Sequence, residues 1–227
     1  MIEVDLATAP LRELNARLHA LPEQTNETHW SISNPRGRHA VAVGVKRPVS
    51  ITINGHVGYY CAGFNTEAEI IINGNAGVGV AENIMSGTVR VKGDASASAG
   101  ATGRGGLLVI EGNAASRCGI SMKGVDIVVK GSVGAMSAFM AQEGNLVVLG
   151  DAGEALGDSL YEARLFVRGK VASLGADCVE KPMGEEETRI LQTLLDRAGF
   201  DASVSEFKFY GSARKLYHFH VDNADAY

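Results

Sequence analysis

The sequence has few aromatic side chains, no excess of basic residues and no long apolar run. Aromatic residues make up 6% of the 227 positions, and Asp and Glu outnumber Lys and Arg by 26 to 21. Because no basic tract stands out, nucleic acid and anionic membranes are poor candidate partners. No window approaches the roughly 20 apolar residues of a membrane-spanning helix, so we expect no membrane partner.

The sequence also lacks a visible targeting segment and a disulfide framework. Its first ten residues, MIEVDLATAP, have neither the basic nor the apolar region of a secretory signal, so we expect a cytoplasmic protein. The cysteines Cys61, Cys118 and Cys178 are three in number and widely spaced. That pattern is typical of reduced, buried thiols in a cytosolic protein.

Glycine is the abundant residue, with 28 copies where average usage would give about 16. Seven of these glycines recur at one constant interval, each nineteen positions after the last: Gly55, Gly74, Gly93, Gly112, Gly131, Gly150 and Gly169. We call them the corner glycines and count positions in each repeat from them, so that position −2 precedes the glycine by two residues. A period that holds over seven repeats predicts a repetitive architecture.

The residues at each position of the repeat share their character. Positions −4 and −2 are aliphatic throughout, position +2 is valine or alanine, and positions +3 and +7 carry only glycine, alanine or serine. An alternating apolar run that ends in glycine is typical of a short strand with one buried face. Besides the corner glycines, we assign a structural role in the repeat to Gly58, Gly77, Gly134, Gly153 and Gly157.

A unit of this length is too short for a pair of helices or for a strand-plus-helix repeat. The pattern therefore predicts an all-β fold, a single-stranded β-solenoid of about seven coils with short helical flanks. At about 3.3 Å per residue, one coil has a perimeter of at most about 63 Å, and seven coils at about 4.8 Å make a rod of roughly 34 Å. So narrow a tube has room for one aliphatic stack.

Stacking of the coils makes two further predictions. Cys61 and Cys118 both occupy position +6, three coils and about 14 Å apart, which is too far for a disulfide. Position −1 forms an outward row in which neighbouring charges alternate in sign. Its residues are Asn54, Asn73, Lys92, Glu111, Lys130, Leu149 and Arg168.

Both ends of a solenoid need covers, because they expose unpaired strand edges. We expect residues 1–36 to form an N-terminal cap with an amphipathic helix that carries Leu11, Leu14, Leu18 and Leu21. Residues 37–182 are the expected β-helix, and residues 29–50 lie out of phase with it and suit an imperfect first coil.

Residues 183–227 form the expected C-terminal segment. Within it, GEEETRILQTLLDRAGF predicts a helix with an acidic first turn and Gly199 as its stop. The aromatic-rich tail that follows suits either a cap on the rod or a surface for another chain.

Two glycine-rich stretches resemble phosphate-binding loops. GATGRGG, residues 100–106, lacks the Gly-Lys-Ser/Thr ending and a following helix, and GNAGVG, residues 74–79, lacks a crossover helix. Because the repeat already accounts for Gly74, Gly77, Gly100 and Gly106, we expect these stretches to be structural.

The remaining candidates for chemistry are histidines and a thiol. His218 and His220 would share one face of a strand and suit a metal pair, but no third ligand accompanies them, so a half-exposed strand is favoured. Arg117 could lower the pKa of the Cys118 thiol, yet no His or Asp partner lies nearby in the sequence. We expect no catalytic residue, cofactor site or metal site on this chain.

The repeats INGHVGYYCAGFN, INGNAGVGV, VKGSVGAM and LGDAGEALGDS resemble those of the GXGXG domain family over residues 37–180. Its members include the C-terminal domain of the glutamate synthase large subunit and one of the subunits of formylmethanofuran dehydrogenase. The resemblance implies a right-handed β-helix that acts as a spacer between reaction centres. The chain departs from the pattern at Ser96, Ala115 and Ala172, where a second glycine would be expected.

The flanks EVDLATAPLRELNARL and FKFYGSARKLYHFHVDN are similar to those of the GXGXG subunit of N-methylglutamate synthase (methylamine–glutamate N-methyltransferase) and its GlxC-type relatives. That resemblance implies a hetero-oligomer in which a glutamine amidotransferase-like chain and a glutamate synthase-like chain with FMN and an iron–sulfur cluster are the partners.

It also implies a non-catalytic subunit of an enzyme complex that converts methylamine and L-glutamate into N-methyl-L-glutamate and ammonia. The alternatives are a subunit of a glutamate synthase or of a formylmethanofuran dehydrogenase-type oxidoreductase, and a β-helix that binds or catalyses on its own.

Overall fold

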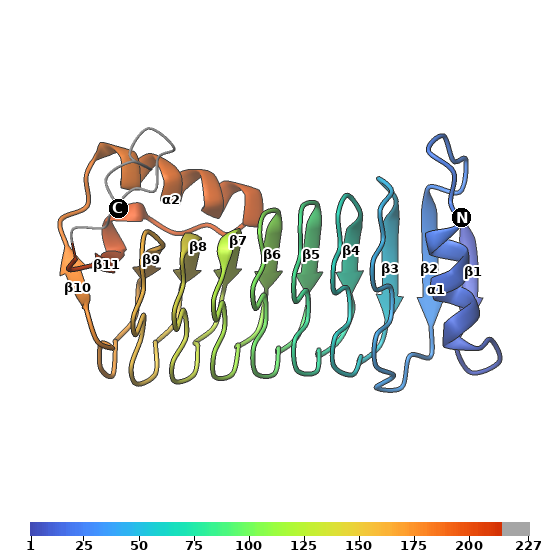
Figure 1. Ribbon diagram of the computed structural model, residues 1–227, viewed down its shortest axis with the longest axis horizontal. Coiled ribbons are helices and arrows are strands. Elements are labelled where there is room, and N and C mark those ends of the chain that lie inside the picture. Colours follow the sequence, from blue (N-terminus) through green and yellow to red (C-terminus); the bar gives the residue numbers. More distant parts are fainter. Residues whose placement is uncertain (215–227) are drawn as a thin grey trace, which may run out of the picture.

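The computed structural model describes residues 1–214 and shows a parallel β-solenoid of about seven turns with two α-helices (Figure 1). The helices are α1 (Leu11–His19) and α2 (Glu185–Ala198), and a short 3₁₀ helix spans Val204–Glu206. The strands are β1 (Ile2–Asp5), β2 (His29–Ser33), β3 (Ser50–Asn54), β4 (Glu69–Ile72), β5 (Thr88–Val91), β6 (Leu107–Ile110), β7 (Lys123–Val129), β8 (Glu143–Val148), β9 (Arg164–Val167), β10 (Cys178–Lys181) and β11 (Lys208–Ser212).

One sheet runs the length of the rod in the order β1-β2-β3-β4-β5-β6-β7-β8-β9-β11-β10. From β1 to β9 every neighbour is parallel, and successive coils from β3 to β9 pair at an offset of nineteen positions, as in Ile51 with Ile70. The exception is the start of β7, where a register shift sets Lys123 opposite Glu143. A second row of parallel bridges joins position +2 of successive coils, from Val57 to Val171. The all-β solenoid predicted from the repeat is therefore confirmed.

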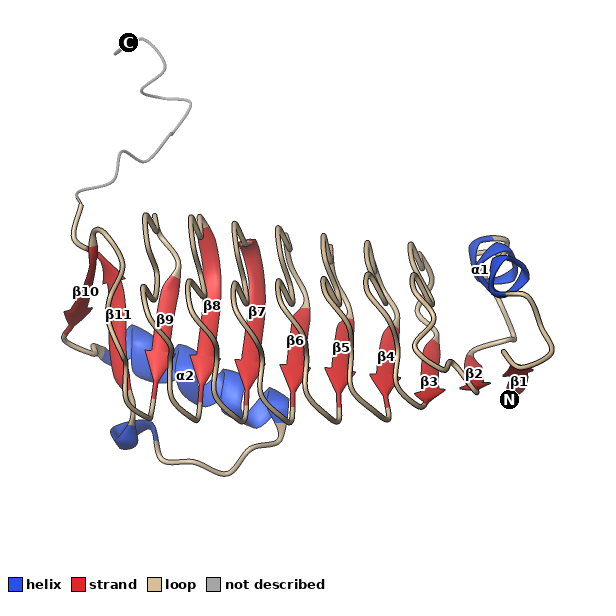
Figure 2. Ribbon diagram, turned by 90° about the horizontal axis from the view of Figure 1, so that it is seen from below, coloured by secondary structure: helices blue, strands red, loops and turns tan. Residues whose placement is uncertain are grey.

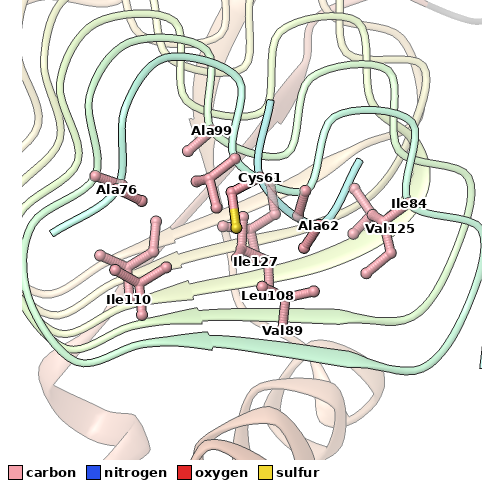
Figure 3. Packing of buried hydrophobic residues seen from close by; sticks show 14 of the residues in the cluster. Cys61, Ala62, Ala76, Ile84, Val89, Ala99, Leu108, Ile110, Val125 and Ile127 are labelled. Carbon is pink, nitrogen blue, oxygen red and sulfur yellow. The ribbon is translucent and has the colours of Figure 1, made fainter. Parts of the chain in front are cut away.

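The core of the rod is a stack of aliphatic side chains that point inward from positions −4 and −2 of each coil. Ile51, Ile53 and Leu108 are fully buried there. Figure 3 shows the opposite wall of the same core, where Cys61, Ala62 and Ala99 face Val89 and Leu108 across the interior. The alanines and glycines at position +7 are thus required because the two walls approach each other closely.

The corner glycines are required chiefly by the neighbouring coil. A Cβ atom on Gly131 would lie 2.4 Å from Asn113 Oδ1 and 2.6 Å from the carbonyl oxygen of Gly112, closer than non-bonded atoms approach. Of the seven corner glycines, Gly55 alone has a left-handed φ, of 138°. The left-handed conformation is found instead at position +7, for example in Ala81, with φ 55°.

The first coil is longer than the others, because β2 pairs with β3 in the register that sets Trp30 opposite Ile51, two positions beyond the regular offset. Helix α1 covers the open end of the core with Leu14 and Leu18, each 1% exposed, and Asn15 donates a 2.8 Å hydrogen bond to the carbonyl oxygen of Ala40. The imperfect first coil and the helix are as expected. Strand β1, which adds one further parallel strand beyond β2, was not predicted.

The other end is closed by residues 185–212. Helix α2 ends at Gly199, with φ 73°, as predicted, and lies along the outer face of the sheet (Figure 2). Strand β11 inserts antiparallel between β9 and β10, and Phe209 stacks on Phe166 with ring centroids 5.3 Å apart. The described part of the aromatic tail therefore packs on the rod as a cap, while His218 and His220 lie outside the described residues.

The close contact at the corner generates a test. We expect Gly131→Ala to lower the free energy of unfolding by about 1–3 kcal/mol, since its methyl group overlaps the backbone of the preceding coil. Gly211→Ala is the control, because its Cβ would meet only the flexible side chain of Lys181, at 3.3 Å or more. Urea denaturation followed by circular dichroism measures both, and equal losses in the two variants would contradict the stacking explanation.

Candidate interaction surfaces

The glycine-rich stretches that resemble phosphate loops are parts of the solenoid wall. A Cβ atom on Gly77 would lie 2.5 Å from the carbonyl carbon of Gly58, and one on Gly103 would lie 2.8 Å from Val125 Cγ1. Their small size therefore serves contacts with the neighbouring coil and the core. Within residues 1–214 no three His, Cys, Asp or Glu side chains are grouped so that they could hold a metal ion.

The three cysteines are free thiols inside the rod or at its end. Burial raises the pKa of Cys61 and of Cys118 to about 12, so neither forms a thiolate at neutral pH. Cys118 is fully buried, and its neighbour Arg117 does not lower its pKa. The predicted absence of a disulfide between Cys61 and Cys118 is confirmed. In the described part of the chain, no helix is both long and apolar enough to span a membrane.

A recess of about 440 Å³ lies beside β9, β10 and β11 at the C-terminal end of the rod. Two of its guanidinium groups are already paired, Arg164 with Glu186 at 2.9 Å and Arg214 with Asp177. Tyr161 adds an exposed ring to its wall. Its mixed lining with paired charges offers a surface for contact rather than a set of groups aligned for a reaction.

A row of side chains at position +1 joins each coil to the next, and we call it the acceptor row. Each side-chain acceptor takes a hydrogen bond from the backbone N–H of the residue one coil further on, at 2.7–3.0 Å. The row ends at Lys170, whose side chain has no acceptor. Its members are His56, Asn75, Asp94, Asn113, Ser132, Asp151 and Lys170.

The acceptor row was not identified from the sequence, although its signal was present. Every member before Lys170 carries a side-chain acceptor one residue after a corner glycine. The row adds a side-chain hydrogen bond to the backbone bridges at each corner and holds successive coils at one spacing.

Replacing one member of the row tests its contribution. Asp94→Ala leaves the N–H of Asn113 without its 2.7 Å acceptor, so we expect a loss of about 1 kcal/mol in the free energy of unfolding. Asp94→Asn keeps an oxygen in the same place and should unfold close to the wild type. Urea denaturation of the two variants measures their free energies of unfolding. An equal loss of stability in Asp94→Asn would show that the charge of Asp94, rather than its hydrogen bond, is responsible.

The outer face of the sheet changes character along the rod. On β6 to β9 it is apolar and is covered by Leu191, Leu194 and Leu195 of α2. On β2 to β5 it is largely polar and open, with Ser31 and Thr52 among its outward residues. The outward residues that α2 and the tail cover are Leu107, Val109, Val128, Val147, Leu149 and Phe166.

At position −1 the predicted alternation of charge is confirmed where Lys92 meets Glu111, whose Nζ and Oε1 atoms are 2.6 Å apart. Leu149 occupies an outward position in the same row, but the cap covers it and leaves it 5% exposed.

Arg90 stands where the polar and the apolar parts of the sheet face meet. Its guanidinium donates to the carbonyl oxygen of Ala198, the last residue of α2, at 2.9 Å, and to Glu111 Oε1 at 3.1 Å. A cation at a helix C-terminus is favourable because it complements the helix dipole. Burial alone would raise the pKa of Glu111, but Lys92 and Arg90 outweigh it and hold that pKa below its usual value.

Removing Arg90 tests whether it holds the end of α2. We expect Arg90→Ala to raise the hydrogen exchange of the last turn of α2 while the first turn changes little, with a stability loss of about 1 kcal/mol. Because the pKa of Glu111 is lower in the folded than in the unfolded chain, its ion pairs with Arg90 and Lys92 stabilise the fold at neutral pH. That stabilisation is lost as the pH falls through the folded pKa.

Arg104→Ala, at an exposed site where no hydrogen bond of the guanidinium is found among residues 1–214, is the matched control. Unchanged exchange at Ala198 in Arg90→Ala would contradict the role given to this residue.

One curated protein matches the chain along its whole length. It is Protein GlxC of Rhizobium meliloti (strain 1021), with 64% identity over 225 residues that cover 99% of each chain. No protein-family model matches the chain, and no solved structure matches it.

Proposed function

This chain belongs to the GlxC family, and we propose that it is a non-catalytic subunit of a glutamate synthase-like complex. The specific complex we propose is N-methylglutamate synthase, which forms N-methyl-L-glutamate and ammonia from methylamine and L-glutamate. The proposal is supported by the full-length similarity to Protein GlxC and by the resemblance of the repeats to the GXGXG domain.

The observation that carries the proposal is the unbroken parallel sheet. From β3 to β9 every pair of strands is parallel and, apart from one register shift at the start of β7, offset by nineteen positions; the acceptor row joins the same coils a second time. A rod built in this way resists bending, and two partner chains that dock on it are held at a fixed separation. Fixed geometry between reacting groups lowers the entropic cost of bringing them together.

The partners in this proposal are a glutamine amidotransferase-like chain and a glutamate synthase-like chain that carries FMN and an iron–sulfur cluster. An iron–sulfur cluster is held by thiolates that converge on one site, whereas Cys61 and Cys118 lie three coils apart and burial raises the pKa of all three cysteines. The cluster therefore does not fit this chain and belongs in the proposal to the synthase-like partner.

Co-expression with the two partner chains tests the proposal. We expect the three chains to co-elute in size-exclusion chromatography, and N-methyl-L-glutamate to form from methylamine and L-glutamate only when this chain is present. The two partner chains expressed without it are the control. Separate elution of this chain, or full activity without it, would contradict the scaffold role. Flavin or stoichiometric metal bound to the isolated chain would favour a β-helix with its own chemistry.

A further inference from the structure

The wall across the core from the β-strands presents one continuous outer face, which we call the ridged face. In the coils that begin at Gly55 to Gly150 the residues at positions +6 and +7 are buried in the core, as Cys61, Ala62 and Ala99 are in Figure 3. The side chains at positions +4, +5, +8 and +9 of these coils are partly or fully exposed, except that of Ala101. Tyr60 at position +5 and Phe64 at position +9 are in edge-to-face contact with centroids 6.4 Å apart. The two rows therefore border the same face, and α2 lies on the sheet side of the rod instead.

The charged side chains of the ridged face and its border lack ion-pair partners. Arg38, Glu82, Arg117 and Glu154 take part in none of the salt bridges formed within residues 1–214, which lie on the sheet face and around the C-terminal cap. Glu82 is partly buried, and burial raises the pKa of its carboxyl group. An unpaired carboxylate in such a place would gain from a cation supplied by another molecule.

Along the ridged face, the charged and apolar side chains of the N-terminal coils are mirrored in the C-terminal coils, with the signs of the charges exchanged. The first coil carries exposed Arg38 at the border of the face, next to His39, whose ring lies against Tyr59 of the second coil. The second coil also carries exposed Phe64, and the third has Glu82. The central coil of this span, which begins at Gly93, places small or hydroxyl residues at these four positions: Ala97, Ser98 and Thr102, which are partly exposed, and Ala101, which is buried.

Beyond the central coil, charged and apolar side chains follow in the reverse order, and each charge has the opposite sign. The fifth coil carries Arg117, the sixth carries Met136, Phe139 and Met140, of which Met140 is 43% exposed, and the seventh carries Glu154. Read from either end, a charge is followed by an apolar patch, a charge of opposite sign and a flat centre. Reversal of the rod thus sets Arg38 opposite Glu154, Phe64 opposite Met140 and Glu82 close to Arg117.

We propose that the ridged face is a self-association surface on which a second copy of this chain docks antiparallel, about a two-fold axis through the coil of Gly93. In a two-fold dimer every contact between two different residues occurs twice, once in each direction. Such a dimer therefore suits a surface whose two ends carry opposite charges. A parallel pair would instead set each coil against itself and bring like charges together. The span from the first coil to the coil that begins at Gly150 has four such positions in each of seven coils, 28 in all, and the coil of Gly169 lies beyond it. Gly63, Gly79 and Ala101 are buried, so 25 positions remain, in line with the roughly 20–30 residues per side of a standard interface.

This proposal goes beyond the proposed function and does not depend on it, because the test uses the isolated full-length chain. Sedimentation velocity across a range of concentrations should show a dimer. We expect Arg38→Glu and Glu154→Arg each to weaken dimerisation roughly tenfold or more, since each places two like-charged pairs in the interface. Glu69→Arg, which makes the same charge change as Glu154→Arg on the exposed sheet face, is the control and should leave the dimer intact.

Mixing the two single variants identifies the contact. In a dimer of one Arg38→Glu chain with one Glu154→Arg chain, one charge pair is native and the other is exchanged, so dimerisation should return to near the wild-type level. Within one chain the two residues are six coils, about 29 Å, apart, so the rescue has to occur between chains.

Unchanged circular dichroism and melting temperature show that the variants fold. A monomeric wild type, a dimer insensitive to both variants, or a mixture that is not rescued would each overturn the proposal. Open-ended growth into larger species would point to head-to-tail contact and would overturn it as well.

Discussion

The hydrogen bonding between coils, at an offset of nineteen positions over most of the rod, is the constraint on which the rest of the molecule depends. A single inserted residue inside a coil would move the aliphatic positions from the core to the outer face, because side chains alternate along a strand. The glycines and small residues follow from the same constraint, since the walls and the neighbouring coils approach within contact distance. A rod built this way changes length only by whole coils, about 4.8 Å at a time.

The sequence alone was sufficient for those parts of the fold that repeat. The strands, the inward aliphatic stack and the free thiols follow from the alignment of one coil on another, and the end of α2 follows from Gly199. The reason is physical: in a solenoid each position contacts its own counterpart in the next coil, so similarity between repeats reports three-dimensional neighbours directly. The function is less accessible, because the repeat determines the solenoid and not what binds to its outer faces.

Features that depend on one copy of the repeat or on distant contacts were not predicted. Strand β1 is four residues long and has no counterpart in the repeat, so only its pairing with β2 reveals it. The covered position of Leu149 depends on which face α2 occupies, and α2 begins much later in the chain, at Glu185. The sequence shows that the corner glycines recur but not why, whereas the structure shows that contact with the preceding coil requires them at most corners.

The placement of α2 over β6 to β9 has a consequence for the order of events at the ribosome. The chain is synthesised from its N-terminus, so Leu107, Val128 and Phe166 are stacked on adjacent coils before residues 185–198 have been made. Until α2 emerges and folds back, the growing rod carries an apolar stripe on an otherwise finished sheet. The N-terminal half, whose outer sheet face is largely polar, exposes no such stripe during synthesis.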